Sequence, residues 1–139
     1  MHSEARRNNT PQPDWRLGTV VLVFVGCLLP FAAKPFHIDD PMYVWAAQHI
    51  AAHPWDFYGF VVNWDGTVTP MATVMKNPPF VSYYLAAVAQ FVGWSEVALH
   101  AALFLPAVGV VLGTYSLSRQ LTGRPGEATL TAALTPVLV

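Results

Sequence analysis

The chain has 139 residues, of which 54% are hydrophobic and only 11% are charged, well below the charged fraction of about 25% in an ordinary soluble domain. Its net charge of -1, with seven Lys and Arg residues in total, leaves no basic patch able to neutralise a run of phosphates, so we exclude nucleic-acid binding. A single cysteine, Cys27, excludes a disulfide framework and a cysteine-based zinc cluster, and the low charge favours a membrane protein.

The first predicted element is an apolar helix over residues 17–33, a charge-free run at the short end of what a tilted helix needs to cross a bilayer. Three arginines lie within the preceding residues 1–16: Arg6, Arg7 and Arg16. They favour a cytoplasmic N-terminal tail, because positive charge is enriched on the cytoplasmic side. A cleaved signal peptide is the alternative, but cleavage after Ala33 places bulky Phe31 where a small residue is required. We therefore predict an uncleaved first transmembrane helix.

A loop over residues 34–96 follows, and the adjacent carboxylates Asp39 and Asp40 lie near its start. Asp40 before Pro41 predicts a helix over residues 41–52, because aspartate accepts from unpaired N–H groups and proline is favoured in a first helical turn. A helix cap needs only one acidic residue, so capping by Asp40 does not account for the presence of Asp39. Adjacent carboxylates repel, and one that points into a cleft can take a proton or bind a hydroxyl group or a metal.

The helix over residues 41–52 is predicted to be amphipathic and to lie at the membrane surface. One face is expected to carry, at three- and four-residue spacings, Met42, Trp45, Ala46, His49 and Ile50. On that face, Trp45 and His49 either pack against the neighbouring spans or contact a substrate.

Aromatic and polar residues are interleaved along the next part of the loop. The rings are Trp55, Phe57, Tyr58 and Trp64, and the polar residues among them are Asp56, Asn63 and Asp65. This composition suits a sugar, whose faces are apolar and whose edges carry hydroxyl groups, or else it anchors the loop among lipid headgroups. Residues 64–67 predict a turn.

A cation and two prolines come next, in the order Lys76, Asn77, Pro78 and Pro79. Lys76 is suited to hold a lipid phosphate, or else it marks the membrane interface. The prolines favour a helix start, and the apolar residues 80–94 are too few for a span, so we predict a second interfacial helix. Its expected anchors at the interface are Tyr83, Tyr84 and Trp94.

A second charge-free run predicts a transmembrane helix over residues 97–118. Arg119 and Arg124 follow within residues 119–126, which we assign to the cytoplasm. Making the preceding interfacial segment a full span would put both arginines outside. Residues 127–139 begin a third transmembrane helix that is too short to cross, so we expect an N-terminal fragment. The predicted fold is an all-α integral membrane protein with a long outer loop that carries interfacial amphipathic helices.

Several short motifs follow one another along the chain in a characteristic order. They are Ile38-Asp39-Asp40-Pro41-Met42-Tyr43, Pro54 with Phe57-Tyr58, Lys76-Asn77-Pro78-Pro79, Tyr83-Tyr84-Leu85, Gly93-Trp94-Ser95-Glu96 and Arg119-Gln120-Leu121-Thr122-Gly123. Together they resemble the N-terminal part of the polyprenyl-phosphate-sugar-dependent glycosyltransferases of the GT-C superfamily. Within it, the similarity is to the bacterial protein O-mannosyltransferase-like and aminoarabinose-transferase-like enzymes, over about residues 17–139.

The resemblance implies inverting transfer of a hexosyl or pentosyl group from a polyprenyl-phosphate donor, on the outer face of the bacterial inner membrane, to a lipid, glycan or protein acceptor. It implies that Asp39 is catalytic near the acceptor and that Lys76 binds the donor phosphate. Four residues are predicted to bind the acceptor or the sugar: Asp40, Tyr43, Trp45 and Tyr58. A divalent metal near the acids is compatible with this chemistry, and the fragment by itself is expected to be inactive.

Two other functions remain open. One is a small non-enzymatic membrane adaptor that binds a partner through the aromatic loop, and the other is a fragment of a transporter. Asp39 and Asp40 lie beyond the predicted span rather than inside it, which counts against ion transport. A gene that continues past Val139 favours the enzyme, whereas a stop codon there favours the adaptor.

Overall fold

The computed structural model describes residues 15–138, with side chains described as far as residue 134. The predictions for residues 1–14, including the cytoplasmic position of Arg6 and Arg7, lie outside the described residues. The chain divides into two compact units. We call Met1–Gly26 with Val108–Val139 the terminal unit and Cys27–Ala107 the central unit. Helices predominate among the described residues of each.

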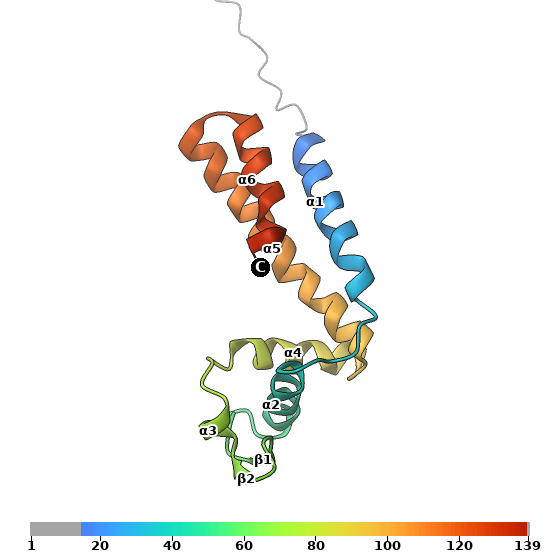
Figure 1. Cartoon of the computed structure of the whole chain (residues 1–139), viewed down its shortest axis with the longest axis vertical. Helices are drawn as coiled ribbons and strands as arrows, with labels where there is room; N and C mark the ends of the chain where they lie inside the picture. The colour runs from blue at the N-terminus through green and yellow to red at the C-terminus, as the bar shows by residue number, and fades with distance from the viewer. Residues whose placement is uncertain (1–14, 139) are drawn as a thin grey trace, which may run out of the picture. The chain divides into compact units, whose positions relative to one another are not determined.

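The predicted transmembrane segments correspond to α1 (Trp15–Leu28) with η1 (Leu29–Phe31), α5 (Glu96–Thr122) and α6 (Pro125–Leu138) (Figure 1). Among residues 15–138, only α5 is both long and apolar enough to cross a membrane. The first predicted span is shorter than expected. Its α-helix ends at Leu28 and a 3₁₀ turn follows, since Pro30 has no N–H to continue the α-helical bonds.

Each helix of the terminal unit buries a narrow face. The buried residues are four apart on each helix, the spacing of one side of an α-helix: Val20 and Phe24, Val111 and Tyr115, and Ala128 and Ala132. Large apolar side chains elsewhere on α5, such as Leu105 and Leu117, are exposed.

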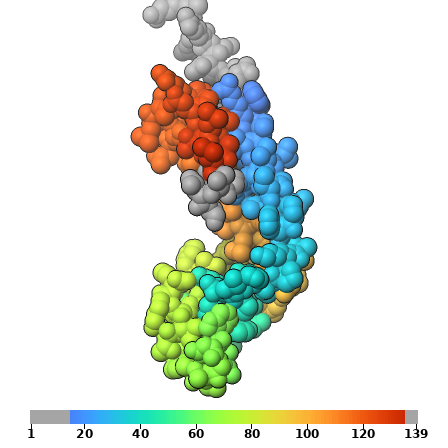
Figure 2. All heavy atoms as spheres, viewed as in Figure 1, coloured from blue at the N-terminus to red at the C-terminus, as the bar shows by residue number. Residues whose placement is uncertain are grey.

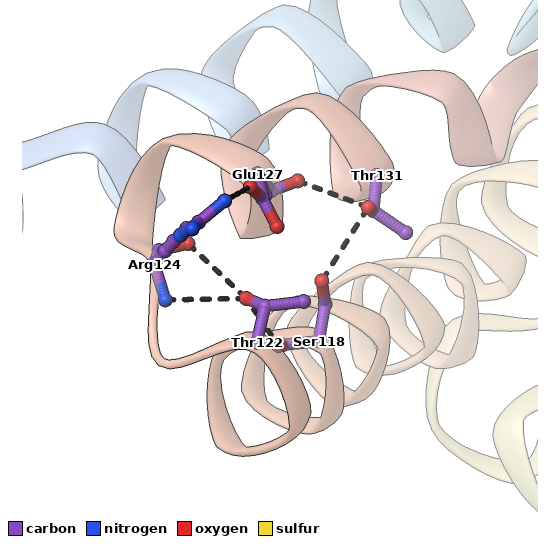
Figure 3. A network of polar contacts seen from close by, with 5 residues as sticks. All are labelled: Ser118, Thr122, Arg124, Glu127 and Thr131. Atoms are coloured by element: carbon purple, nitrogen blue, oxygen red, sulfur yellow. Dashed lines mark hydrogen bonds and ion pairs between the residues drawn. The ribbon is translucent and has the colours of Figure 1, made fainter.

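The connection between α5 and α6 is shorter than the predicted loop over residues 119–126. Gly123, with a φ of 64°, ends α5 in the left-handed conformation that glycine adopts most readily. Arg124 Nη1 donates to Glu127 Oε1 at 2.7 Å, and the Arg124 N–H donates to Thr122 Oγ1 at 3.2 Å (Figure 3). These local bonds fix the reversal of the chain and start α6 at Pro125.

The central unit is built on the packing of α2 (Asp40–Ala52) against α4 (Phe80–Val92) (Figure 1). The two helices match the ones predicted over residues 41–52 and 80–94 closely, and α4 ends at Gly93, whose φ is 78°. Their shared core contains small and branched residues from α2, α4 and the first turn of α5: Val44, Ala47, Ile50, Leu85, Ala86, Ala89 and Leu99.

A two-stranded hairpin packs on the other side of α2. Strands β1 (Val61–Asn63) and β2 (Val68–Pro70) are antiparallel, with Val62 opposite Thr69, and α3 (Met71–Val74) follows directly. This side has its own core, formed by Ala46, Val62, Met71 and Met75. Figure 2 shows atoms of the hairpin region lying beside those of α2 on one face of the central unit.

Two sequence predictions therefore need correction. The fold is mostly helical but includes the hairpin, whose strands have three residues each. Helix α2 is buried on two sides, not one, because Ala46 and Ala47 are small enough to let α4 and the hairpin approach. Trp45, predicted to share a face with Ala46 and Ile50, is instead exposed.

The tyrosines expected to anchor α4 at a membrane interface bond to the protein itself. The Tyr83 hydroxyl donates to the carbonyl of Pro54, and the Tyr84 hydroxyl donates to the carbonyl of Ala102 at 2.6 Å. Both bonds tie α4 to neighbouring segments of the central unit.

Candidate functional site

A hollow at the start of α2 collects residues from three separate segments of the central unit. Its lining residues are Asp39, Met42, Tyr43, Trp64, Val74, Met75, Lys76 and Asn77, and its volume is about 410 Å³. We call it the polar hollow. It brings together Asp39 and Lys76, the two residues to which the sequence assigned the chemistry.

The backbone before α2 places Asp39 at the edge of this hollow. Ile38 has a φ of 48°, an unusual conformation for a β-branched residue, and Asp39 occupies the N-cap position of α2. The Asp39 side chain makes no capping hydrogen bond, so its carboxylate is left for the hollow. The prediction that Asp40 caps the helix is wrong: Asp40 is the first helical residue, and its Oδ2 accepts from the His37 N–H at 2.9 Å.

Asp40 lines a different hollow, which we call the apolar hollow. Its volume is about 160 Å³, and most of its lining residues are apolar or aromatic: Phe36, Tyr43, Val44, Val81, Leu85, Leu99 and Leu103, with Asp40 and His100. His100 Nδ1 is buried without a hydrogen-bond partner in the described part of the chain, and the His100 ring meets Phe36 edge-on at 5.1 Å between centroids. The two acids predicted to act together therefore face different surroundings.

Lys76 lies just after α3, and its ammonium is held from one side only. Lys76 Nζ donates to the Ala72 carbonyl at 2.8 Å. Within residues 15–138, Lys76 and Asp39 line the same hollow without forming an ion pair. The ammonium group of Lys76 and the carboxylate of Asp39 are therefore both available to bind a ligand in the hollow.

Tyr43 and Asn77 line the polar hollow, and Tyr58 bonds to Asn77 from outside it. Asn77 Nδ2 donates to Tyr43 Oη at 2.6 Å, and Tyr58 Oη donates to the Asn77 carbonyl at 2.7 Å. Burial, and secondarily the neighbouring Tyr43, raises the pKa of Tyr58 above its ordinary value of 10.0. Tyr58, predicted to bind sugar, supports the wall without lining the hollow. Asn77 was not singled out as a site residue, because nothing in the sequence pairs it with Tyr43.

Trp45 also lies outside the polar hollow. Its ring meets Trp64 edge-on, with 6.2 Å between centroids and 79° between planes, and it lines a further groove with residues of β1. Of the residues predicted to bind sugar or acceptor, only Tyr43 lines the polar hollow directly.

The described residues contain no group of three or more His, Cys, Asp or Glu side chains arranged to hold a metal ion. Asp39 is the single carboxylate of the polar hollow.

No protein-family model, no curated protein and no solved structure matches this chain. What the polar hollow can do must follow from its own side chains. A carboxylate can orient or deprotonate a hydroxyl group, an ammonium group can bind a phosphate, and the Trp64 and Tyr43 rings offer apolar surface beside both.

Proposed function

We propose that this chain carries the acceptor site and the donor-phosphate site of a membrane glycosyltransferase that uses a polyprenyl-phosphate-linked sugar, of the GT-C kind. The observation that carries the proposal is that Asp39 and Lys76, distant in sequence, line one hollow and do not pair. A carboxylate and a cation that line one hollow match the two groups whose charge changes in such a reaction, the acceptor that loses a proton and the phosphate that leaves.

In the proposed reaction, Asp39 orients an acceptor hydroxyl or amine and takes its proton as the acceptor attacks the anomeric carbon of the donor sugar. The bond from that carbon to the phosphate oxygen breaks, and its electron pair leaves with the lipid phosphate. Lys76 offsets the negative charge that builds on this phosphate. A single displacement of this kind inverts the configuration of the sugar.

Helix α5 supports a position in the membrane. Its 27 residues make it about 40 Å long, and the hydrocarbon core of a bilayer is about 30 Å thick. Exposed apolar side chains such as Leu105 suit contact with lipid. Arg119 and Arg124 at the far end of α5 favour a cytoplasmic location for that end. We therefore propose that the central unit lies on the outer face of the bacterial plasma membrane.

The test uses membranes that contain the full-length product of the gene, a panel of radiolabelled polyprenyl-phosphate sugars and extracted acceptors. Asp39→Asn should lower transfer by about 10²- to 10⁴-fold and leave membrane insertion unchanged. Asp65→Asn makes the same chemical change in the exposed hairpin turn and serves as the matched control. Transfer by Asp39→Asn at the rate of the control would remove Asp39 from catalysis.

A non-enzymatic adaptor is the second candidate, and the exposure of Trp55 favours it. Trp55 is 95% exposed and Phe57, two residues later, is 38% exposed, so this part of the loop has aromatic surface open to a partner. If no donor in the panel is consumed by the wild-type protein, and Trp55→Ala abolishes the retention of a partner from the same membranes, the adaptor function replaces the enzyme.

A further inference from the structure

A groove adjoins the polar hollow along α2. Its volume is about 480 Å³, and its lining residues are Trp45, Gln48, Phe60, Val61, Val62 and Asn63. We call it the aromatic groove. It and the polar hollow, at about 410 Å³, each fall within the range of about 300–1,000 Å³ that small-molecule sites occupy.

Two walls run from the polar hollow into the aromatic groove. On α2, Met42 lines the hollow and Trp45 lines the groove, and residues three apart are neighbours on a helix surface. On the hairpin, Trp64 lines the hollow and the preceding residue, Asn63, lines the groove. The edge-to-face contact between Trp45 and Trp64 marks the boundary. A ligand that leaves the hollow over Trp64 therefore meets Trp45 next.

The side chains of the aromatic groove have the chemistry of a carbohydrate site. Trp45 is 38% exposed, so part of its ring is open to an apolar sugar face. The side-chain amides of Gln48 and Asn63 are exposed and have no hydrogen-bond partner among residues 15–138, so both donors and acceptors are available to hydroxyl groups. None of the six lining residues is charged.

The absence of charge among these six residues favours an uncharged acceptor over a charged lipid or peptide. The groove offers no opposite charge to a phosphorylated lipid headgroup or a charged peptide. An uncharged sugar chain needs none, since its hydroxyl groups can bond to the amides and its ring faces can pack on aromatic surface.

We propose that the acceptor is an uncharged oligosaccharide whose reacting end lies at Asp39 and whose preceding sugar units lie in the aromatic groove, on Trp45 and between Gln48 and Asn63. This inference rests on the proposed glycosyltransferase function and narrows the acceptor from lipid, protein or glycan to glycan.

The binding test uses the purified full-length protein in detergent and an array of short, linear, uncharged oligosaccharides of hexoses and pentoses. Trp45→Ala should lower the affinity for the glycans that the wild-type protein binds by about tenfold. Trp45→Phe keeps a ring and should recover most of the affinity. Trp94→Ala is the matched control, because Trp94 is 37% exposed, close to the 38% of Trp45, and lines neither the groove nor the hollow. Equal glycan binding by the Trp45→Ala and Trp94→Ala variants would overturn the inference.

Transfer kinetics separate this inference from the proposed function. With a glycan acceptor, Trp45→Ala should raise KM about tenfold and leave kcat near that of the wild type, whereas Asp39→Asn should keep glycan binding and lose kcat. Undiminished transfer by Asp39→Asn, together with weakened glycan binding by Trp45→Ala, would overturn the catalytic proposal and keep the carbohydrate site. Unchanged glycan binding by Trp45→Ala, together with weaker association with phosphatidylcholine vesicles, would assign Trp45 to the membrane and overturn the inference.

Discussion

The polar hollow and the apolar hollow both adjoin the start of α2, yet they are made from different kinds of residue. The apolar hollow is walled by Val44, Leu85 and Leu99, which also form the core between α2 and α4. The polar hollow is walled by residues at the ends of elements, such as Asp39 before α2 and Lys76 after α3. The comparison teaches that adjacent carboxylates need not share a task, since Asp39 lines the polar hollow and Asp40 lines the apolar one.

The largest expected effect separates activity from stability at the polar hollow. Lys76→Ala should lower glycosyl transfer by about 10²- to 10³-fold, because the charge that develops on the leaving phosphate loses its cation. Its stability should change little, since Lys76 is exposed. Lys76→Arg keeps the charge and should retain part of the activity. Steady-state transfer assays measure the activity, and thermal unfolding measures the stability. Full activity of Lys76→Ala would contradict the proposed role of Lys76 in the polar hollow.

The reverse pattern is expected at the apolar hollow. Leu85→Ala should lower the free energy of unfolding of the central unit by roughly 2–5 kcal/mol, because Leu85 is 4% exposed and its truncation enlarges a space in the core. Thermal or denaturant unfolding in detergent measures this change. The fraction that stays folded should retain its affinity for donor, and a variant as stable as the wild type would show that this hollow is not part of the core.

A smaller effect is expected from loosening the wall of the polar hollow. Tyr58→Phe removes the hydrogen bond to the Asn77 carbonyl and should cost about 1 kcal/mol near neutral pH. Because the pKa of Tyr58 is raised in the folded state, its contribution is complete below pH 10 and is lost as the pH rises through the folded value. Unfolding measured from pH 8 to pH 11 should show a steeper decline for the wild type than for Tyr58→Phe, and parallel curves would contradict it.

The smallest expected effect lies in the hairpin turn, outside both hollows. The Thr67 hydroxyl donates to Asp65 Oδ1 at 2.9 Å, and this bond, followed by backbone bonds, holds the pKa of Asp65 below its ordinary value of 3.8. The stabilisation is therefore present above that value and is lost as the pH falls through the lower, folded pKa. In Thr67→Val, carbon-13 NMR titration should show the pKa of Asp65 rising towards 3.8, with glycosyl transfer unchanged. A pKa that does not move would assign the shift to the backbone bonds alone.

Local rules of chain geometry account for the parts of the fold that were predictable. Asp40 and Pro41 mark the start of α2, and His53 with Pro54 marks its end, because proline restricts the residue before it. The turn at residues 64–67 was predicted from Gly66, whose φ is 91°. The strands on either side were not predicted, since three-residue strands give too short an alternation to read.

The sequence predicted several residues of the candidate site but not which of them lie together in space. Asp39 and Lys76 were chosen from the sequence, and the structure brings them into one hollow. Asp39 lies at the N-cap of α2 and Asp40 is its first helical residue, and the Ile38 before them adopts a left-handed conformation that no glycine or asparagine predicts. The bond from Asn77 to Tyr43 joins segments far apart in the chain, and no local pattern encodes such a contact.

Tyr43 lines both the polar and the apolar hollow, and its hydroxyl oxygen accepts a hydrogen bond from Asn77 Nδ2. Since packed interiors have little free volume, a ligand that displaces Tyr43 from one hollow takes space from the other. We therefore expect a ligand in the apolar hollow to weaken donor binding in the polar one. Xenon under pressure, which binds in apolar cavities, should lower the affinity for donor, and unchanged affinity under xenon would contradict this coupling.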